Sequence, residues 1–308
     1  MNSSIALKTE NVNKIYKQGN ENINALKNIS FEVKTGEIFG LLGPNGAGKS
    51  TFINILAGTV NKTNGYVNVW GFNLDKNPRQ VRASIGIVPQ EINVDPFFSP
   101  RKLLNLQAGL YGIKKKDRIT DLILKMVALE DKANAYSRSL SGGMKRRLLI
   151  AKAMVHQPPI LILDEPTAGV DVELRNILWK NVKELNKEGV TIILTTHYLL
   201  EAQEMCDRIA IIDKGNLVAL DTTQKLLERI QTKKINFTVR DVDINKSLLI
   251  KGIKLKIISK NLISATYEKG SLDFREIINY LNQNEIKIED ISTEEGDLED
   301  VFVQLTKH

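Results

Sequence analysis

The fold of this chain is decided by one stretch, Gly43-Pro44-Asn45-Gly46-Ala47-Gly48-Lys49-Ser50-Thr51. An apolar run from Glu37 to Leu42 precedes it and predicts a buried strand. The pattern from Ser50 to Ala57 places apolar residues on one face and predicts a helix. The glycine-rich stretch is therefore predicted to be a loop between a strand and a helix, which is the context of a phosphate-binding loop.

The chemistry of this loop suits a triphosphate and a divalent cation. Glycines allow backbone N–H groups to converge on an anion, and the start of a helix adds partial positive charge. Lys49 can reach the outer phosphates, and the Ser50 hydroxyl can hold Mg²⁺. The alternative is a glycine-rich turn that binds nothing, but such a motif should arise by chance in roughly 1% of chains of this length. We therefore predict a nucleotide site.

Composition sets the outer limits of the interpretation. A chain of 308 residues, 42% hydrophobic and 26% charged, has room for one large globular domain and a smaller one. The net charge of +7 suits nucleic acid, the anionic inner face of a membrane, or a lysine-rich surface without a special partner. Cys206 is the only cysteine, which excludes an internal disulfide and fits a reducing cytosol. We expect neither a secretory signal nor a spanning helix, so contact with a membrane would need another chain.

Two carboxylates follow a second apolar run. Ile160 to Pro166 predicts a buried strand that ends in Asp164 and Glu165. Buried carboxylates are costly unless a cation or hydrogen bonds compensate them, and Mg²⁺ held by Ser50 would be such a cation. Ligands of parallel sheets collect at the carboxyl ends of the strands, where the phosphate loop and Asp164 both fall. Glu165 is better suited as the base that orients water against the terminal phosphate.

Three further side chains stand at predicted strand ends. His197 follows a strand from Val190 to Thr195, and either a phosphate contact or a packing role fits it. Gln90 follows Pro89 at the end of a strand predicted at Ile85 to Val88, and its amide can both donate and accept hydrogen bonds. Tyr16 precedes a turn between antiparallel strands predicted at Ile5 to Tyr16 and Ala25 to Val33. It could stack on a purine base, although packing explains a lone tyrosine more simply.

Helical patterns between Ser99 and Val155 predict a helical insert between strands of the main sheet, and Ser99-Pro100 has the N-cap and first-turn chemistry of a helix start. The insert leads to Leu140-Ser141-Gly142-Gly143-Met144, directly before a helix from Lys145 to Val155. Ser141 suits the N-cap of that helix, and the two glycines offer a second anion site at a helix start. The segment from Val94 to Phe98 is apolar and turn-forming. We interpret it as a small core plug rather than an exposed docking surface.

The pattern changes after a helix predicted at Thr222 to Ile230, with Gln231 to Lys234 as a polar hinge to a separate α+β unit. This unit contains no catalytic constellation that we can find. The predicted domains are therefore residues 1–231, with a helical subdomain at about 91–157, and residues 232–308. The expected elements of the second domain are strands at Ile235 to Val239, Lys254 to Ile258, Leu262 to Tyr267 and Ile286 to Ile291, with helices near Asp273 to Gln283 and Leu298 to Thr306.

Together these motifs resemble an ATP-binding cassette ATPase, from Ile5 to about Ile230. The phosphate loop paired with Leu140 to Gly143 is the specific feature, since other phosphate-loop enzymes lack the second motif. More narrowly, the loop and the run from Asp164 to Asp171 look like bacterial multidrug or polysaccharide exporter subunits whose permease is a separate polypeptide. The residues that carry the resemblance are Gly43 to Thr51, Gln90, Leu140 to Met144, Leu161 to Glu165, Asp171 and His197.

The resemblance implies a fold class and partners. The fold would be α/β, a phosphate-loop core with a mixed sheet, an antiparallel β subdomain and a helical insert, followed by a small C-terminal α+β domain. Two copies would form a head-to-tail homodimer, with each ATP between one chain's phosphate loop and the other chain's Ser141-Gly142-Gly143. An integral membrane permease would hold the cassette at the cytoplasmic face of the plasma membrane. No nucleic acid partner is expected.

The resemblance also implies a role for each motif residue. Met144 is the one departure from the family's motif pattern, because the family most often has glutamine at this position. For nucleotide binding, Tyr16 would stack on adenine, Gly43 to Thr51 would hold the phosphates, and Asp171 would order the dimer contact. For the metal and hydrolysis, Ser50 and Asp164 would serve Mg²⁺, and Gln90 would touch the metal or the water and report to the membrane partner through the segment after it. Glu165 would act on the water and His197 would contact the terminal phosphate, so the expected catalytic side chains are Glu165, His197 and Gln90.

Two rival functions can be weighed against an exporter subunit. A soluble cassette ATPase that acts on ribosomes or nucleic acid has weak support from the basic charge. Such proteins usually carry two cassettes or long coiled-coil inserts, and the sequence shows neither an internal repeat nor sustained heptads. A small-molecule kinase would leave Leu140 to Gly143 and His197 unexplained. We therefore expect the energy-supplying subunit of an exporter, with specificity for the transported substance in the permease.

Overall fold

The computed structural model describes residues 4–19, 21–168, 170, 172–230, 232–243, 248, 250, 253–268, 274–294 and 297–306. The chain divides into two compact units, Met1–Thr223 and Gln224–His308. The division falls before the predicted hinge at Gln231, because helix α8 (Thr223–Glu228) begins at the boundary.

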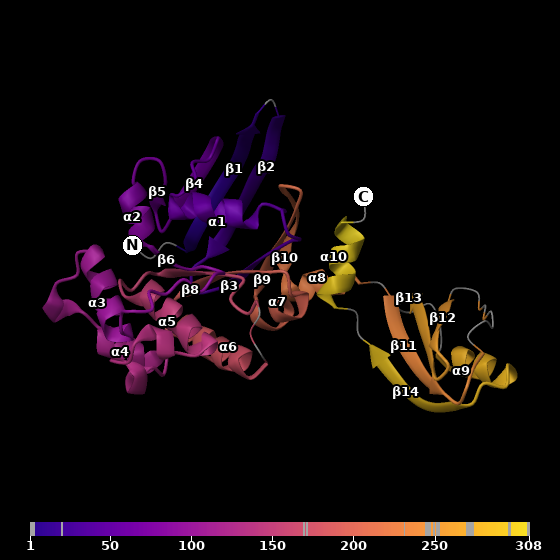
Figure 1. The fold of residues 1–308 in the computed structure, drawn as a ribbon. Coiled ribbons are helices and arrows are strands. Elements are labelled where there is room, and N and C mark those ends of the chain that lie inside the picture. Colours follow the sequence, from indigo (N-terminus) through magenta and orange to yellow (C-terminus); the bar gives the residue numbers. More distant parts are fainter. Residues whose placement is uncertain are drawn as a thin grey trace. The chain divides into compact units, whose positions relative to one another are not determined.

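A mixed sheet forms the centre of the first unit, with strand order β10-β9-β3-β8-β7-β6 (Figure 1). Strands β9, β3, β8, β7 and β6 run parallel, and β10 pairs antiparallel with β9. Every residue of β3 and β8 is buried, as expected for parallel strands covered by helices on both sides. The strands are β3 (Ile38–Leu42), β6 (Ile85–Val88), β7 (Ile160–Asp164), β8 (Thr191–Thr196), β9 (Arg208–Asp213) and β10 (Asn216–Thr222).

An antiparallel sheet with the order β2-β1-β4-β5 lies on one side of the central sheet (Figure 1). Its long hairpin runs further than the sequence predicts, with register shifts along the β1–β2 pair. A shared core joins the sheets, where the ring of Phe31 lies 5.3 Å from the rings of both Phe39 and Phe52. The strands are β1 (Ile5–Gln18), β2 (Glu21–Lys34), β4 (Asn64–Val69) and β5 (Phe72–Asn73).

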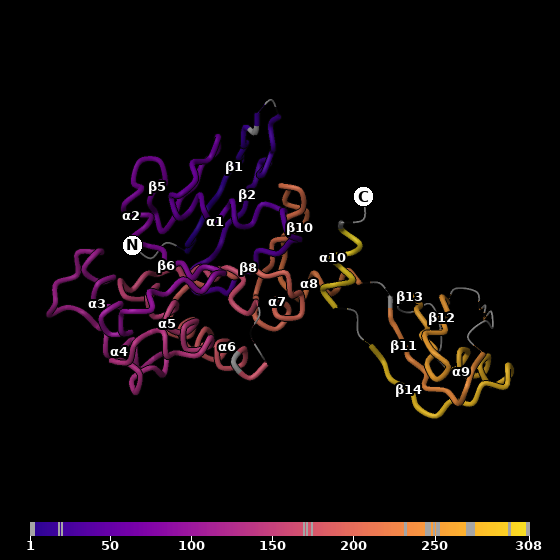
Figure 2. Tube along the Cα trace, viewed as in Figure 1, coloured from indigo at the N-terminus to yellow at the C-terminus, as the bar shows by residue number. Residues whose placement is uncertain are grey.

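Helices cover both faces of the central sheet. Helix α1 lies on the side of the antiparallel sheet, and α5 and α6 lie on the other side, as the trace in Figure 2 also shows. The Ser99 and Ser141 hydroxyls accept backbone N–H bonds at the starts of α3 and α5, so both predicted caps are confirmed. The helices are α1 (Lys49–Ala57), α2 (Pro78–Ala83), α3 (Pro100–Leu110), α4 (Thr120–Met126), α5 (Gly142–Met154), α6 (Val172–Lys187) and α7 (Leu199–Met205), with 3-10 turns at Lys115–Asp117, Glu130–Lys132 and Ser137–Ser139.

The second unit contains an antiparallel sheet with the order β12-β13-β11-β14. Helix α9 packs Ile277 and Leu281 onto a core that includes Phe237 and Ile263. Strand β11 begins at Thr232, so Thr232 to Lys234 of the predicted hinge already belong to the sheet, and Gln231 lies outside the described residues. The elements are β11 (Thr232–Val239), β12 (Ile253–Ser259), β13 (Leu262–Glu268), β14 (Ile288–Glu294), α9 (Phe274–Gln283) and α10 (Leu298–Thr306).

No helix in the described part of the chain is both long enough and apolar enough to cross a bilayer.

Candidate active site

The carboxyl ends of strands β3, β8, β7 and β6 meet along one edge of the central sheet. Their register pairs Leu42 with Thr196, Thr195 with Asp164, and Leu163 with Val88. The phosphate loop follows β3, and the loop that begins with His197 follows β8. The loop that begins with Glu165 follows β7, and the segment with Gln90 follows β6. The prediction that these groups gather at the strand ends is therefore confirmed, since parallel strands place their carboxyl ends at a common edge.

Close backbone approach explains the glycines of the phosphate loop. Gly46 and Gly48 have φ angles of 82° and 113°, which side chains of L-residues rarely adopt. A Cβ at Gly48 would lie 2.5 Å from the Ala25 carbonyl oxygen, and one at Gly43 would lie 2.1 Å from that of Ile212. Gly48 is also the N-cap of α1, so the loop delivers backbone N–H groups to the helix start.

Lys49 lies within this loop and is only 5% exposed. Its Nζ donates to the carbonyl oxygens of Gly43 at 2.7 Å and Pro44 at 3.1 Å, and lies 3.9 Å from Glu165 Oε1. Burial lowers the pKa of Lys49, while the charges of Glu165 and Asp164 oppose that shift. The ammonium is therefore held between the loop and the carboxylates, where it can meet an anionic ligand.

Glu165 is the centre of the cluster, and its side chain is largely buried. Its Oε2 accepts a hydrogen bond from Gln90 Nε2 at 3.1 Å and lies 3.2 Å from His197 Nδ1. Its backbone has a φ of 45°, and the N–H donates to the Thr195 carbonyl oxygen at 3.0 Å. Such strained residues gather at functional sites. The structure thus brings together the three side chains predicted to be catalytic.

His197 faces this cluster rather than the core. Its side chain is 38% exposed, and its ring lies 4.2 Å from the ring of Tyr198. The polar ring edge of His197 lies at Glu165 while its ring lies beside that of Tyr198, so the phosphate contact that the sequence left open beside packing stays a prediction.

Asp164 has a partner that the sequence did not reveal. Thr195 Oγ1 donates to Asp164 Oδ1 at 2.6 Å across the β7–β8 pair. Burial raises the pKa of Asp164, and the Glu165 charge adds to the shift, whereas the Thr195 bond and Lys49 oppose it. The only sequence signal for Thr195 is a polar residue at a strand end.

Magnesium fits the donors at this edge. Ser50, Asp164 and Gln90 offer hydroxyl, carboxylate and amide oxygens, and hard cations prefer oxygen ligands. The described residues include no group of three or more His, Cys, Asp and Glu side chains that could hold a metal. This suits Mg²⁺, which is usually bound by one or two carboxylates together with substrate phosphates and water.

Other predicted site residues lie elsewhere in the chain. Tyr16 is near the end of β1, with Lys14 Nζ 4.6 Å from its ring centre. Ser141, Gly142 and Gly143 are at the start of α5. Within the described residues, no hydrogen bond or ion pair joins these groups to Lys49 or Glu165. Asp171 lies outside the described residues.

The segment from Val94 to Phe98 is at the surface, so its interpretation as a core plug is wrong. Phe97 is 72% exposed and Phe98 37%. The Phe97 N–H donates to Asp95 Oδ1 at 2.9 Å, and the Arg138 N–H donates to the Pro96 carbonyl oxygen. These bonds hold the segment against the outside of the helices as a turn, which leaves no room for it in the core.

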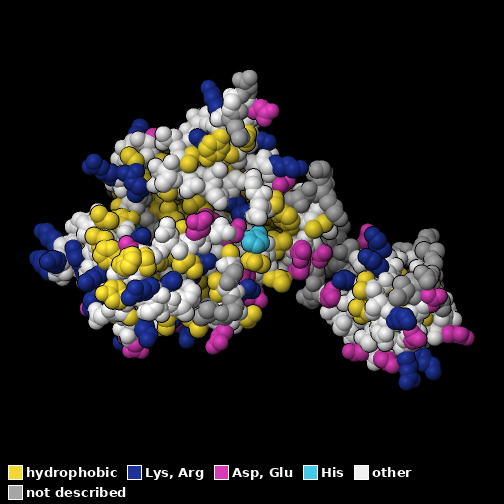
Figure 3. Space-filling view, in the orientation of Figure 1, with side chains coloured by type: hydrophobic (Ala, Val, Ile, Leu, Met, Phe, Trp, Pro, Cys, Tyr) yellow, Lys and Arg dark blue, Asp and Glu magenta, His cyan; other side chains and the backbone are white. Residues whose placement is uncertain are grey.

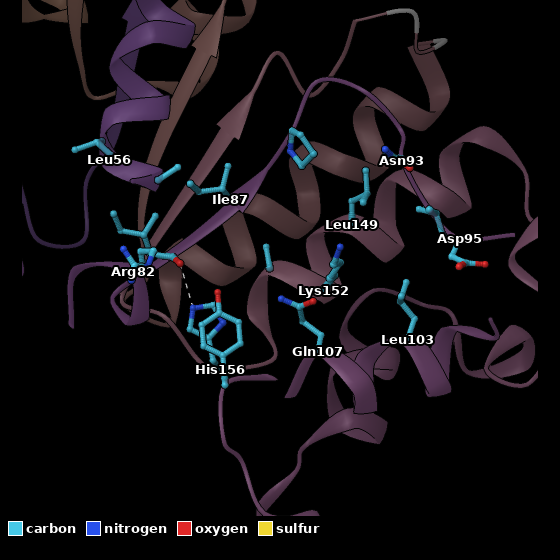
Figure 4. Close-up of a pocket in the computed structure, with 16 residues that line it drawn as sticks. Leu56, Arg82, Ile87, Asn93, Asp95, Leu103, Gln107, Leu149, Lys152 and His156 are labelled. Atoms are coloured by element: carbon cyan, nitrogen blue, oxygen red, sulfur yellow. Dashed lines mark hydrogen bonds between the residues drawn. The ribbon is translucent and has the colours of Figure 1, made fainter. Parts of the chain in front are cut away.

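A pocket of about 630 Å³ opens beside this segment (Figure 4). One wall comes from α1, α2 and β6, and the other from α3 and α5, with Asn93 and Asp95 at the rim. At one end the Tyr111 and His156 rings stack 3.8 Å apart, and His156 Nε2 lies 3.1 Å from the Ile85 carbonyl oxygen. Burial lowers the pKa of His156, which favours the neutral ring.

Fold and site together define a phosphate-loop nucleoside triphosphatase with a helical insert. Comparison with known proteins gives its family. The ABC transporter family matches residues 26–168. The linearmycin resistance ATP-binding protein LnrL of Bacillus subtilis is 42% identical over 227 residues, 73% of this chain and 71% of that protein. The Nod factor export ATP-binding protein I of Burkholderia orbicola is 40% identical over 202 residues, 65% of this chain and 66% of that protein.

Solved structures that are similar to this chain are cassettes of the same family. The dimeric post-hydrolysis structure of the ATP-binding cassette MJ0796, bound to ADP and Pi, has a TM-score of 0.63 at 31% identity and covers 70% of this chain and 98% of its own. The structure of cbiO1 from Clostridium perfringens has a TM-score of 0.64 at 30% identity and covers 73% of this chain and 92% of its own. The chain belongs to the ABC transporter family. It is an ATP-binding and ATP-hydrolysing cassette, and the expected fold class is confirmed.

Proposed function

We propose that this cassette is the energy-supplying subunit of an exporter, with Glu165 as the base that activates water. The observation that carries the proposal is the arrangement around Glu165. Gln90 Nε2 and His197 Nδ1 lie 3.1 and 3.2 Å from its Oε2, and Lys49 Nζ lies 3.9 Å from Oε1. Phosphoryl transfer depends on positioning and on neutralising charge, and this group of side chains can do both.

The other site residues take roles that follow from their places. Lys49 and the N–H groups of Gly43 to Thr51 would bind the phosphates, in exchange for the carbonyl contacts that Lys49 now makes. Ser50, Asp164 and Gln90 would hold Mg²⁺, which when bound neutralises phosphate charge. His197 would contact the terminal phosphate, and Tyr16 would stack on adenine.

Two chains would share each ATP. Ser141 and Gly142 are exposed at the start of α5 and have no described bond to the chain's own phosphate loop. A helix start with an exposed serine and glycine suits the phosphates of an ATP held by a second copy. The dimeric relative bound to ADP and Pi supports this arrangement. Asp171, which lies outside the described residues, would order the contact between the copies.

A membrane permease is the proposed partner, reached through the pocket beside Gln90. Asn93 and Asp95, which follow Gln90 closely in the chain, form part of the pocket rim. Exposed apolar side chains lie in and near this region, and Figure 3 shows hydrophobic surface over α3 with Lys and Arg side chains around it. The names of two relatives refer to Nod factor export and to linearmycin resistance, which supports an exporter at the cytoplasmic face of the membrane. The C-terminal unit has a hydrophobic core of its own, which supports its role as an accessory domain.

Mixed dimers test the sharing of ATP between chains. Lys49→Ala in one chain and Ser141→Arg in the other would leave one complete site, so measurable activity should remain. Both changes in the same chain, paired with a wild-type partner, would damage both sites and abolish activity. If each site lay within one chain, the two results would be reversed. Tandem affinity tags on the two chains isolate the mixed dimers.

Co-purification tests the permease. Phe97→Ala should weaken capture of a co-expressed permease by about tenfold or more if this ring anchors the contact. Phe72→Ala is the matched control, because Phe72 is also exposed but lies on β5, in the antiparallel sheet. If RNA or ribosomes co-purified with the chain in place of a membrane protein, the result would favour a soluble cassette ATPase and contradict the proposal.

A further inference from the structure

Arg146 is a buried cation on helix α5. It follows the Ser141-Gly142-Gly143 motif by one turn and is only 3% exposed. No carboxylate among the described residues lies within ion-pair distance of its guanidinium. Burial lowers the pKa of Arg146, but a guanidinium remains protonated in proteins. A buried charge without an acidic partner is costly unless hydrogen bonds compensate it. The hydrogen bonds of Arg146 therefore show which segments it holds in place.

Those hydrogen bonds go to the two segments that frame Glu165. Nη1 donates to the carbonyl oxygens of Gln90 at 2.7 Å and of Pro89 at 3.2 Å. Nη2 donates to the Ala168 carbonyl oxygen at 3.4 Å. Ala168 in turn donates its N–H to the Glu165 carbonyl oxygen at 3.2 Å, which places it in the turn after the base.

The neighbouring Arg147 provides a natural comparison. It is also partly buried on α5 and also donates to two backbone carbonyl oxygens, those of Val127 at 2.8 Å and Ala128 at 2.9 Å. Both acceptors directly follow α4, within the group of α3, α4 and α5. Arg147 therefore ties these helices to each other, whereas Arg146 ties α5 to the nucleotide site.

We propose that Arg146 is a positioning residue that couples the start of α5 to Gln90 and to the turn after Glu165. Movement of α5 shifts the Gln90 backbone, and with it the Gln90 amide that bonds to Glu165 Oε2. The role rests on the proposed sharing of ATP between two chains, since the start of α5 then contacts the ATP of the partner. Each chain thus senses ATP at its neighbour's site through Arg146 and adjusts its own Glu165 site.

Arginine-to-lysine variants test this coupling. Lysine keeps the positive charge but is a single point donor, so it cannot reach both segments as the guanidinium fork does. We expect Arg146→Lys to lower kcat by about 10-fold to 10²-fold, the scale of a small misplacement of catalytic groups. The Kd for a fluorescent ATP analogue should stay within about twofold, because the phosphate loop is untouched. The Hill coefficient for ATP should fall from above 1 to 1.

Arg147→Lys is the matched control and should keep wild-type kcat and Hill coefficient. Melting temperatures of both variants check the fold, and Arg146→Gln adds a neutral variant that retains N–H donors. The proposal is overturned if Arg146→Lys keeps the wild-type kcat and Hill coefficient, or if Arg147→Lys lowers both as much as Arg146→Lys does. It is also overturned if the wild-type Hill coefficient is 1. Full activity of Glu165→Gln would instead refute the proposed function, so the two failures are distinguishable.

Discussion

Replacement of Glu165 by glutamine is the most direct perturbation of this site. The amide has nearly the same shape as the carboxylate, and its oxygen can still accept the Gln90 hydrogen bond made at 3.1 Å. What changes is the ability to take a proton from water. The charge 3.9 Å from Lys49 Nζ is also lost, but Lys49 keeps its bonds to the Gly43 and Pro44 carbonyl oxygens. The variant should therefore fold and bind ATP.

The expected loss can be estimated from the role of the carboxylate. A positioned general base contributes about 10²-fold to 10⁴-fold to the rate. At about 1.4 kcal/mol for each factor of ten, the barrier should rise by about 3 to 5 kcal/mol. Glu165 is only 7% exposed, which leaves little room for bulk water to replace it as a base. The melting temperature should change by no more than a few degrees, because removal of a charge beside Asp164 offsets the loss of the Lys49 attraction.

The assay is phosphate release at saturating Mg²⁺ and ATP, with light scattering to follow association. We expect hydrolysis at least about 10²-fold slower, with a closed dimer that accumulates in ATP. Glu204→Gln, an exposed carboxylate on α7, is the control and should behave as the wild type. Wild-type turnover in Glu165→Gln would refute the assignment of the base.

Three further changes address the residues around the base. Thr195→Val removes the 2.6 Å hydrogen bond to Asp164 at constant shape, and should destabilise the chain by about 1–3 kcal/mol in urea unfolding and slow hydrolysis; unchanged values would argue against this support of Asp164. Burial raises the pKa of Asp164 in the folded chain, so its stabilising contribution is present below the unfolded pKa and is lost as the pH rises through the folded pKa. Asp164→Asn should therefore melt higher than the wild type at pH 7 without nucleotide, with a difference that shrinks in acid; a lower melting temperature at pH 7 would contradict this. Gly48→Ala should lower the free energy of unfolding by about 1–3 kcal/mol from its φ of 113° alone. Its Cβ would also clash with the Ala25 carbonyl oxygen at 2.5 Å, and ATP binding should be abolished. Gly109→Ala is the control and should fold normally, because its Cβ would meet only the end of the Arg118 side chain at 3.3 Å.

Local patterns predicted most of the elements that build the site. The strand before Gly43, the helix after it and the N-caps at Ser99 and Ser141 depend on residues close together in the chain, and all four are present. Short elements such as α2, β5 and α7 were not predicted, because two to seven residues are too few for a clear period.

Surface and core are harder to separate from sequence. Phe97 and Phe98 lie in an apolar segment that reads equally well as buried or exposed. Their exposure depends on the turn at Asp95 and on bonds to residues about 40 positions later, such as that from Ser137 Oγ to the Phe98 carbonyl oxygen. A local pattern contains no information about such distant partners.

The sequence alone determined the nucleotide chemistry of this protein, because the phosphate loop and the strand-end carboxylates need only local spacing and the rule that parallel strands share an edge. Only the tertiary structure decided which side chains support that chemistry. Thr195 meets Asp164 across a strand pair, and Arg146 reaches Gln90 over 56 positions. Such contacts arise when distant segments are packed together, and only then do a threonine and an arginine acquire their partners.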